Sequence, residues 1–184
     1  MQRLTTTLRS LAACACLAVL VGCAATRAST NTAAIEAAVV TATDIDRLTG
    51  EPWRGTLTYL DHTSPVQTTI KSSLLMTRLP DQPDGAIAWD MSVGYADEPH
   101  ANSGETAVLA RGGRIFRGGN VLERTVLSDG MVRVVTEQDG QDDGRAAQLR
   151  FVYLLGETQC SIQKLVRLLP DGAFFERHIY RWSR

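Results

Sequence analysis

The segment Ala147-Gln-Leu-Arg-Phe-Val-Tyr-Leu-Leu155 places an apolar side chain at every second position. A period of two is typical of a β-strand with one buried face, and it does not fit an amphipathic helix. Residues 160–168 continue the same alternation. Pro170-Asp-Gly172 then predicts a tight turn before a last strand over residues 174–182. This end of the chain is therefore expected to be antiparallel β-structure.

The chain before this segment shows the same kind of pattern. Short alternating runs between Gly, Asp and Pro residues predict strands over 53–59, 66–79, 86–95, 107–110, 114–117, 121–127 and 131–137. Between the last two runs, Ser128-Asp-Gly130 is typical of a hairpin turn. No helix of ten residues is evident from residue 53 onward, which argues against a parallel α/β fold.

The fold class expected from this pattern is all-β. We expect eight to ten strands in an antiparallel meander that closes into a barrel, because closure removes the exposed edges of the sheet. A β-sandwich is the alternative. A short helical turn is expected to precede the barrel, with Thr43 or Asp44 as its N-cap and Gly50 at its end.

Length and charge exclude several classes of protein. The 184 residues carry a net charge of −1, and 44% of them are hydrophobic. This is enough for one domain with a core of its own, and it excludes disorder of the whole chain. The absence of a basic excess argues against nucleic acid as a partner.

The first residues have the composition of a signal peptide. Residues 1–10 contain Arg3 and Arg9 but no acidic residue, and residues 11–21 form an apolar run. That run is shorter than the about 20 residues that a membrane-spanning helix needs, and it matches the hydrophobic part of a secretory signal.

Leu20-Val-Gly-Cys23 at the end of this run resembles the bacterial lipobox. The resemblance implies cleavage between Gly22 and Cys23, a diacylglyceryl group on the Cys23 thiol, and acylation of the new amino terminus. Several acyl chains together anchor a protein stably to a membrane. Ala24 after the cysteine implies export to the outer membrane, facing the periplasm. An ordinary secretory signal is the alternative.

These features divide the chain into a signal peptide (1–22), a lipid-anchored linker rich in Ala, Thr and Ser (23–44) and a barrel domain (45–184). Cys160 is then the only cysteine of the domain. Neither a disulfide within the domain nor a thiolate metal cluster is expected. Cys160 is interpreted as a buried apolar residue, with a redox thiol as the alternative.

Leu48-Thr-Gly-Glu-Pro-Trp-Arg-Gly55 resembles the Gly-x-Trp entry of the calycins, the superfamily of lipocalins and fatty-acid-binding proteins. One extra residue separates Gly50 from Trp53. The resemblance implies a barrel in which an arginine from a late strand packs on the Trp53 indole and closes one end. Arg177 and Arg181 are the candidates for that arginine.

A barrel of this size holds one small ligand or is filled by its own side chains. In the first case we expect a small apolar or amphipathic ligand, bound without catalysis. The side chains expected to line its pocket are Leu57, Tyr59, Trp89, Met91, Phe151 and Tyr153. Arg133, Arg150 or Lys164 would pair with a ligand carboxylate if it pointed inward. In the second case the protein is a structural or interaction protein of the cell envelope.

Two polar segments suggest other chemistry. Asp97, Glu98 and His100 are grouped in one expected loop, where an enzyme would find an acid, a base or metal ligands. Their spacing matches no metal motif, so we expect neither a metal nor a catalytic residue. Asp139-Gly-Gln-Asp-Asp-Gly-Arg145 superficially resembles a calcium loop, but its ligand spacing is wrong and a solvated hairpin tip is expected.

His178 lies in the expected last strand. The nitrobindins, haem proteins with a similar small barrel, also begin with a Gly-x-Trp type of motif and use a histidine ligand. Their other residues cannot be matched here, so haem rests on likeness of fold and no cofactor is expected. The expected partners are the membrane, through the lipid anchor, and a small apolar ligand. The sequence leaves the oligomeric state open.

Overall fold

A computed structural model describes residues 38–61, 66–80 and 82–184. The chain divides into two units, Met1–Ala34 and Ile35–Arg184, and all described residues belong to the second. The expected signal peptide, Cys23 and most of the expected linker lie outside the described residues. The described elements are α1 (Ala42–Asp46), β1 (Trp53–Leu60), β2 (Gln67–Arg78), β3 (Ile87–Tyr95), η1 (Pro99–Ala101), β4 (Ser103–Ala110), η2 (Arg111–Gly113), β5 (Ile115–Phe116), β6 (Gly119–Val126), β7 (Val132–Asp142), β8 (Arg145–Leu155), β9 (Gln159–Leu168) and β10 (Phe175–Ser183).

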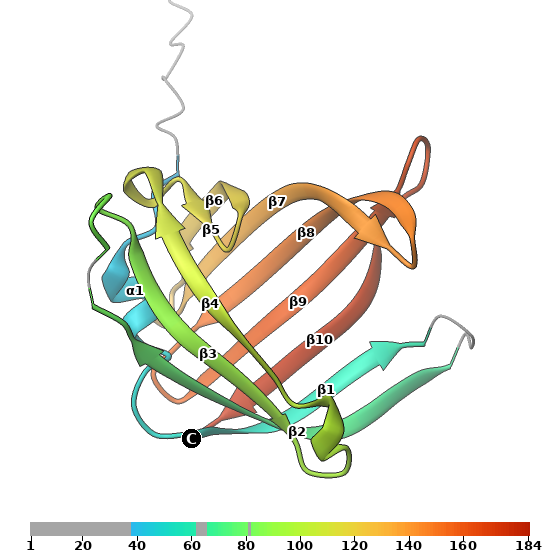
Figure 1. Ribbon diagram of the computed structural model, residues 1–184, viewed down its shortest axis with the longest axis horizontal. Coiled ribbons are helices and arrows are strands. Elements are labelled where there is room, and N and C mark those ends of the chain that lie inside the picture. The colour runs from blue at the N-terminus through green and yellow to red at the C-terminus, as the bar shows by residue number, and fades with distance from the viewer. Residues whose placement is uncertain (1–37, 62–65, 81) are drawn as a thin grey trace, which may run out of the picture. The chain divides into compact units, whose positions relative to one another are not determined.

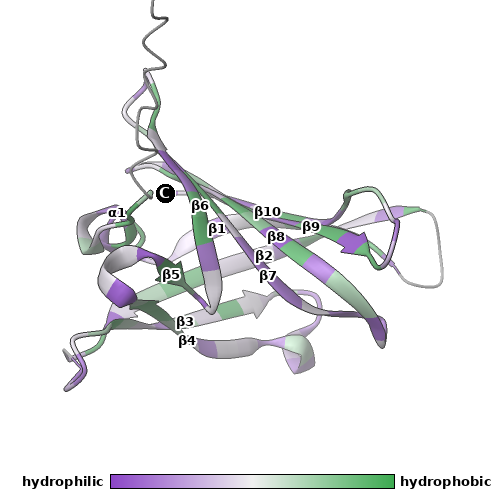
Figure 2. Ribbon diagram, turned by 90° about the horizontal axis from the view of Figure 1, so that it is seen from above, coloured by the Kyte–Doolittle hydropathy of each residue, from purple (hydrophilic) through white to green (hydrophobic). Residues whose placement is uncertain are grey.

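The ten described strands form one closed antiparallel barrel (Figure 1). Every strand pairs with its neighbours in sequence, and β1 closes the ring by pairing with β10, from Arg54↔Ser183 to Tyr59↔His178. The hydropathy changes between successive residues along the strands (Figure 2), as expected where one face of each strand points inward. The expected all-β meander closed into a barrel is confirmed. None of the described helices is long and apolar enough to cross a membrane.

The helix α1 begins earlier than the sequence pattern predicted. Its N-cap is Thr41 rather than Thr43 or Asp44. The backbone N–H and the hydroxyl of Thr41 both donate to Oδ2 of Asp44, at 2.8 and 2.9 Å. Asp44 therefore acts from inside the first turn, as the acidic member of a capping box does.

Large aromatic side chains fill the end of the barrel next to α1. All three tryptophans are buried, and each indole N–H has an acceptor. Nε1 of Trp53 donates to the Leu48 carbonyl at 2.8 Å, Nε1 of Trp89 to Oδ1 of Asp46 at 2.8 Å, and Nε1 of Trp182 to Oγ of Ser72 at 3.0 Å. Two of the three acceptors belong to α1 and the turn after it, so this short segment seals the barrel end.

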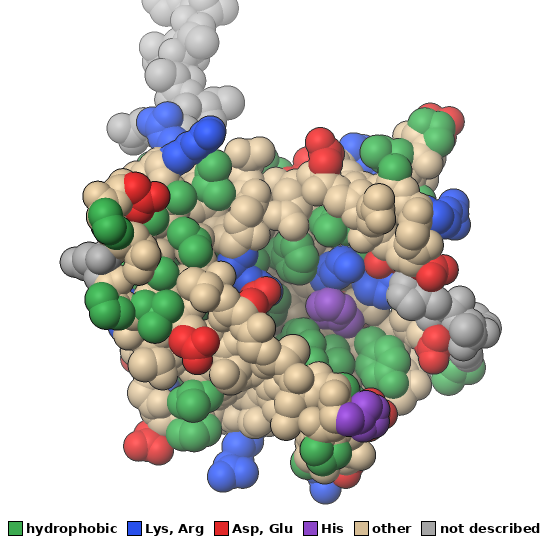
Figure 3. All heavy atoms as spheres, viewed as in Figure 1, with side chains coloured by type: hydrophobic (Ala, Val, Ile, Leu, Met, Phe, Trp, Pro, Cys, Tyr) green, Lys and Arg blue, Asp and Glu red, His purple; other side chains and the backbone are tan. Residues whose placement is uncertain are grey.

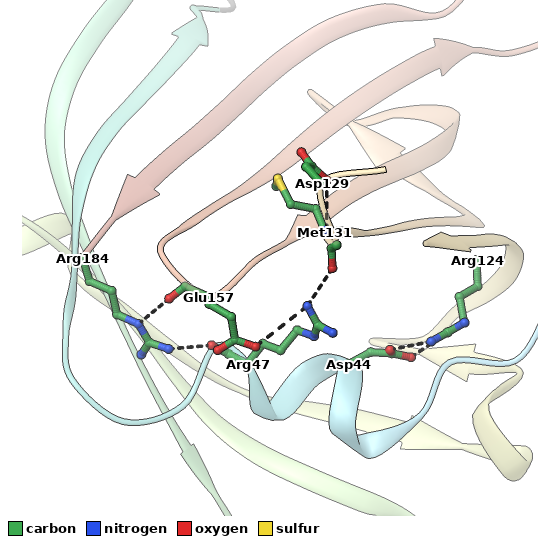
Figure 4. Close-up of polar contacts among 8 residues, drawn as sticks. Asp44, Arg47, Arg124, Asp129, Met131, Glu157 and Arg184 are labelled. Carbon is green, nitrogen blue, oxygen red and sulfur yellow. Dashed lines mark hydrogen bonds and ion pairs between the residues drawn. The ribbon is translucent and has the colours of Figure 1, made fainter. Parts of the chain in front are cut away.

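The arginine that packs on Trp53 is Arg184, which corrects the expectation of Arg177 or Arg181. Its guanidinium carbon lies 4.2 Å from the centre of the indole. The same guanidinium donates to the Thr49 carbonyl at 2.8 Å. It also donates to the carbonyls of Arg47 and Glu157, at 2.9 and 3.1 Å (Figure 4). Arg181 is exposed on β10, whereas Arg184 follows the strand and reaches back over the closed end.

Cys160 belongs to this packed end. Its side chain is buried in the hydrophobic core, and burial raises the pKa of its thiol to about 12. A thiol with such a pKa is a poor nucleophile at neutral pH. These observations favour the apolar role of Cys160 over the redox role.

Replacement of Asp44 by alanine is expected to lower the free energy of unfolding by about 2 kcal/mol. The Asp44 side chain is 4% exposed, and it accepts from Thr41 and, through both oxygens, from Arg124 at 2.8 Å (Figure 4). Urea unfolding measures the loss, with Asp139→Ala as the control because Asp139 is exposed on the barrel. Equal losses in the two variants would show that α1 does not depend on this contact.

Candidate ligand-binding site

The half of the barrel away from α1 contains two adjoining cavities. The first, here called the mouth cavity, has a volume of about 440 Å³ and lies at the ends of β1, β3, β7 and β10. The second, the inner cavity, has a volume of about 280 Å³ and lies deeper, beside β4. Lys164 and His178 line both cavities, so the two meet at these side chains. Figure 3 shows the hollow, in which apolar, acidic, basic and histidine side chains gather.

Four of the six expected pocket residues line these cavities. Leu57 and Tyr59 lie in the wall of the mouth cavity, and Met91 and Phe151 lie in the wall of the inner cavity. The other two belong to the packed core instead. Trp89 is fully buried and hydrogen-bonded to Asp46. Tyr153 is 1% exposed and packs edge-to-face on Phe116, with ring centres 5.2 Å apart.

The mouth cavity contains a buried carboxylate between two cations. Asp142, 3% exposed in its side chain, accepts from Nη2 of Arg177 and lies 3.3 Å from Nζ of Lys164. Burial would raise the pKa of Asp142, but the hydrogen bond from Arg177 and the charge of Lys164 outweigh burial and lower it. Asp142 is therefore ionised at neutral pH, and it neutralises one of the two cations.

Arg177 reaches this cavity because the strand is irregular. The register of β10 against β9 shifts between Glu176 and His178, which places Arg177 in a β-bulge. A bulge turns a side chain away from the direction that strict alternation would give it. Arg177 also donates to the Leu60 carbonyl at 3.1 Å, so it ties β10 to the end of β1.

In addition to Lys164, which it shares with the mouth cavity, the inner cavity contains the cation Arg117, from the turn between β5 and β6. Arg117 has a φ of 49° and precedes Gly118, so the left-handed turn directs its side chain into the barrel. It pairs with Glu105, whose side chain is 50% exposed whereas that of Arg117 is 20% exposed. The Arg117 guanidinium carbon lies 5.8 Å from the Phe151 ring centre.

His178 stands among these charges at the junction of the cavities. Burial lowers its pKa to about 4, and the positive charges of Lys164, Arg117 and Arg177 act in the same direction. The imidazole is therefore neutral at neutral pH. Next to it, Tyr180 packs edge-to-face on His178, and the Tyr180 hydroxyl lies 2.6 Å from the Tyr95 hydroxyl across the barrel.

The loop that suggested an enzyme is not assembled into a catalytic group. Asp97 and His100 are exposed at or next to η1. Of the three loop residues, only Glu98 lines the mouth cavity. No group of three potential metal-binding side chains occurs in the described part of the chain. The expected hairpin tip at 139–145 is partly wrong, because β7 continues to Asp142 and buries that residue.

Of the three cations considered as ligand partners, only Lys164 lines a cavity. Arg133 pairs with Glu123, and Arg150 donates to Glu137 at 2.7 to 2.9 Å. Arg117, Asp142 and Glu105 are site residues that the sequence pattern did not identify. Comparison with protein-family models, curated proteins and solved structures found no match to this chain.

Proposed function

We propose that this protein is a lipid-anchored periplasmic protein that binds one small amphipathic molecule in its barrel, without catalysing a reaction. The main support is the pair of adjoining cavities, which combine apolar walls with a few charged side chains. Pockets of about 300 to 1,000 Å³ with this mixture of side chains are typical of small-molecule sites. A barrel filled by its own side chains, the structural alternative, would not contain such cavities.

The anchor and the location rest on the sequence Leu20-Val-Gly-Cys23 and on Ala24. Acyl chains on Cys23 would hold the barrel near the outer membrane, with the part of the chain between Cys23 and α1 as the linker. Amphipathic molecules concentrate at a membrane surface because their apolar parts leave water there. A tethered barrel whose cavities combine apolar walls with charged side chains is suited to receive such molecules.

Replacement of Ile70 by tryptophan is expected to block the mouth cavity. Ile70 lines that cavity from β2, and an indole there would occupy space that the ligand needs. Decanol and decanoate serve as probes, titrated calorimetrically into the full chain carrying Cys23→Ser, to which no anchoring acyl chain is attached. We expect the dissociation constants to rise at least about tenfold, a loss of about 1.4 kcal/mol.

The matched control is Lys71→Trp, because Lys71 is the next residue of β2 and its side chain is exposed. This variant should bind both probes as the parent chain does. If neither probe binds the parent chain, or if both tryptophan variants bind equally well, the proposal of a ligand inside the barrel is wrong.

A further inference from the structure

The charges at the junction of the two cavities do not balance. Three cations line the cavities, namely Lys164, Arg117 and Arg177, and they face two carboxylates, Asp142 and Glu105. Asp61 and Glu98 also line the mouth cavity, but Asp61 is exposed and Glu98 is half-buried, so water weakens their effect on the interior. Around His178 the three cations therefore outweigh the carboxylates, of which only Asp142 acts on the neutral imidazole.

The excess charge resides on the Lys164 and Arg117 side of the junction. Arg177 and Asp142 form the tighter contact in the mouth cavity, and Lys164 lies at the longer distance of 3.3 Å from Asp142. The partner of Arg117 is half in solvent, whereas Arg117 itself is mostly buried. A buried cation without a full counter-charge is costly, so a bound anion would stabilise this arrangement.

Unused hydrogen-bond donors point to the same place. Nε of Arg117 is buried and has no hydrogen-bond partner among the described residues. Lys164 has three N–H groups, of which one faces Asp142, and the neutral His178 ring has one N–H. A carboxylate can accept hydrogen bonds on two oxygens, which fits donors on several sides of one position.

We propose that the ligand is a monoanion whose carboxylate binds between Lys164, Arg117 and His178, where the mouth cavity meets the inner cavity. This inference rests on the proposed function and names the subsite within it. Asp142 stays in place and holds Arg177, so the ligand supplies the missing negative charge rather than replacing a resident one. The ligand's apolar part lies against the cavity walls, formed in the mouth by Leu57 and Ile70 and deeper in by Met91 and Ile162.

Two substitutions should change the affinity for decanoate in opposite directions. Lys164→Met removes the shared cation and is expected to weaken decanoate binding about thirtyfold, since a hydrogen bond to a charged group contributes about 2 kcal/mol. Asp142→Asn removes the neighbouring negative charge and is expected to strengthen decanoate binding several-fold. Decanol lacks the charge, so its affinity should change less than about threefold in both variants.

The chain supplies a control for each variant. Lys71→Met changes its only other lysine, which is exposed on β2, and Asp139→Asn changes an exposed carboxylate of β7. Both should bind decanoate as the parent chain does. If decanol and decanoate bind the parent chain but Lys164→Met weakens both equally or neither, the carboxylate subsite is wrong and the binding barrel stands. If neither probe binds the parent chain, both proposals fall.

Discussion

Replacement of Gly55 by alanine is expected to lower the free energy of unfolding by about 3 kcal/mol or more, the largest loss that we predict for a single methyl group. Gly55 lies in β1, opposite Trp182 of β10, at the point where the barrel closes. A Cβ atom at Gly55 would lie 1.9 Å from the Arg181 carbonyl oxygen and 2.8 Å from Cα of Trp182. Both atoms belong to the backbone, so no side-chain rotation can make room.

The strands β1 and β10 must therefore separate at Gly55, and this separation breaks the pairing that closes the ring. Gly104→Ala is the matched control, because a Cβ there meets nothing nearer than 3.8 Å and Gly104 also lies within a strand. Urea unfolding of both variants gives the comparison, and thermal unfolding serves if Gly55→Ala is too unstable in urea. Similar stabilities would mean that β1 and β10 can move apart at little cost.

The alternation of apolar and polar residues was sufficient to predict the class of fold and most strands. It works where one face of a strand is buried and the other is wet, as in β8, in which Leu149, Tyr153 and Leu155 are buried. The alternation pattern fails at the end of β7, because Asp139 and Asp142 are of a residue type that is typical of turns. The backbone pairing of β7 with β8 nevertheless continues to Asp142↔Arg145.

The site was harder to predict because its charged residues are placed by irregular features. Arg117 comes from a left-handed turn and Arg177 from a β-bulge, and neither feature follows from periodicity. Lys164 and His178 are different, because each is in phase with buried neighbours. Lys164 shares one face of β9 with the buried Ile162 and Val166, and a charged residue on such an inward face was an available signal of a polar site.

The resemblance to the calycins led to the correct end of the barrel but to the wrong arginine. Trp53 is buried at that end, and a guanidinium does lie on its ring. In β10, however, Tyr180 and Trp182 alternate with the exposed Arg181, so a residue of that phase is directed away from the indole. Arg184 lies beyond the last paired residue, and its freedom from the sheet lets it fold back over Trp53.

The histidine at the cavity junction should make folding strongly dependent on pH. In the folded protein the pKa of His178 is about 4, because of burial and of the charges on Lys164, Arg117 and Arg177, against which only Asp142 acts. In the unfolded chain the pKa returns to about 6.5. The unfolded state thus binds more protons between these values, and the free energy of unfolding falls as the pH decreases from about 6.5 to about 4.

The expected loss attributable to His178 over this window is about 3 kcal/mol. Above pH 6.5 the imidazole is neutral in both states and contributes no pH dependence, and below pH 4 it is protonated in both. His178→Gln keeps a polar side chain that does not titrate. Between pH 6.5 and pH 4, the free energy of unfolding of this variant should therefore fall by about 3 kcal/mol less than that of the parent chain. Urea unfolding at pH 7, 6, 5 and 4 measures the difference.

The carboxylates with lowered pKa values, Asp44, Glu123 and Asp142, also reduce stability in acid, but they are present in both chains, so their contributions largely cancel in the comparison. His100→Gln, on the exposed η1 turn, is the matched control and should retain the pH dependence of the parent chain. A constant difference between the parent chain and His178→Gln from pH 7 to pH 4 would show that His178 titrates alike in the folded and unfolded states. Neither burial nor the cations at the cavity junction would then shift the pKa of His178. That result would argue against an excess of positive charge at the junction.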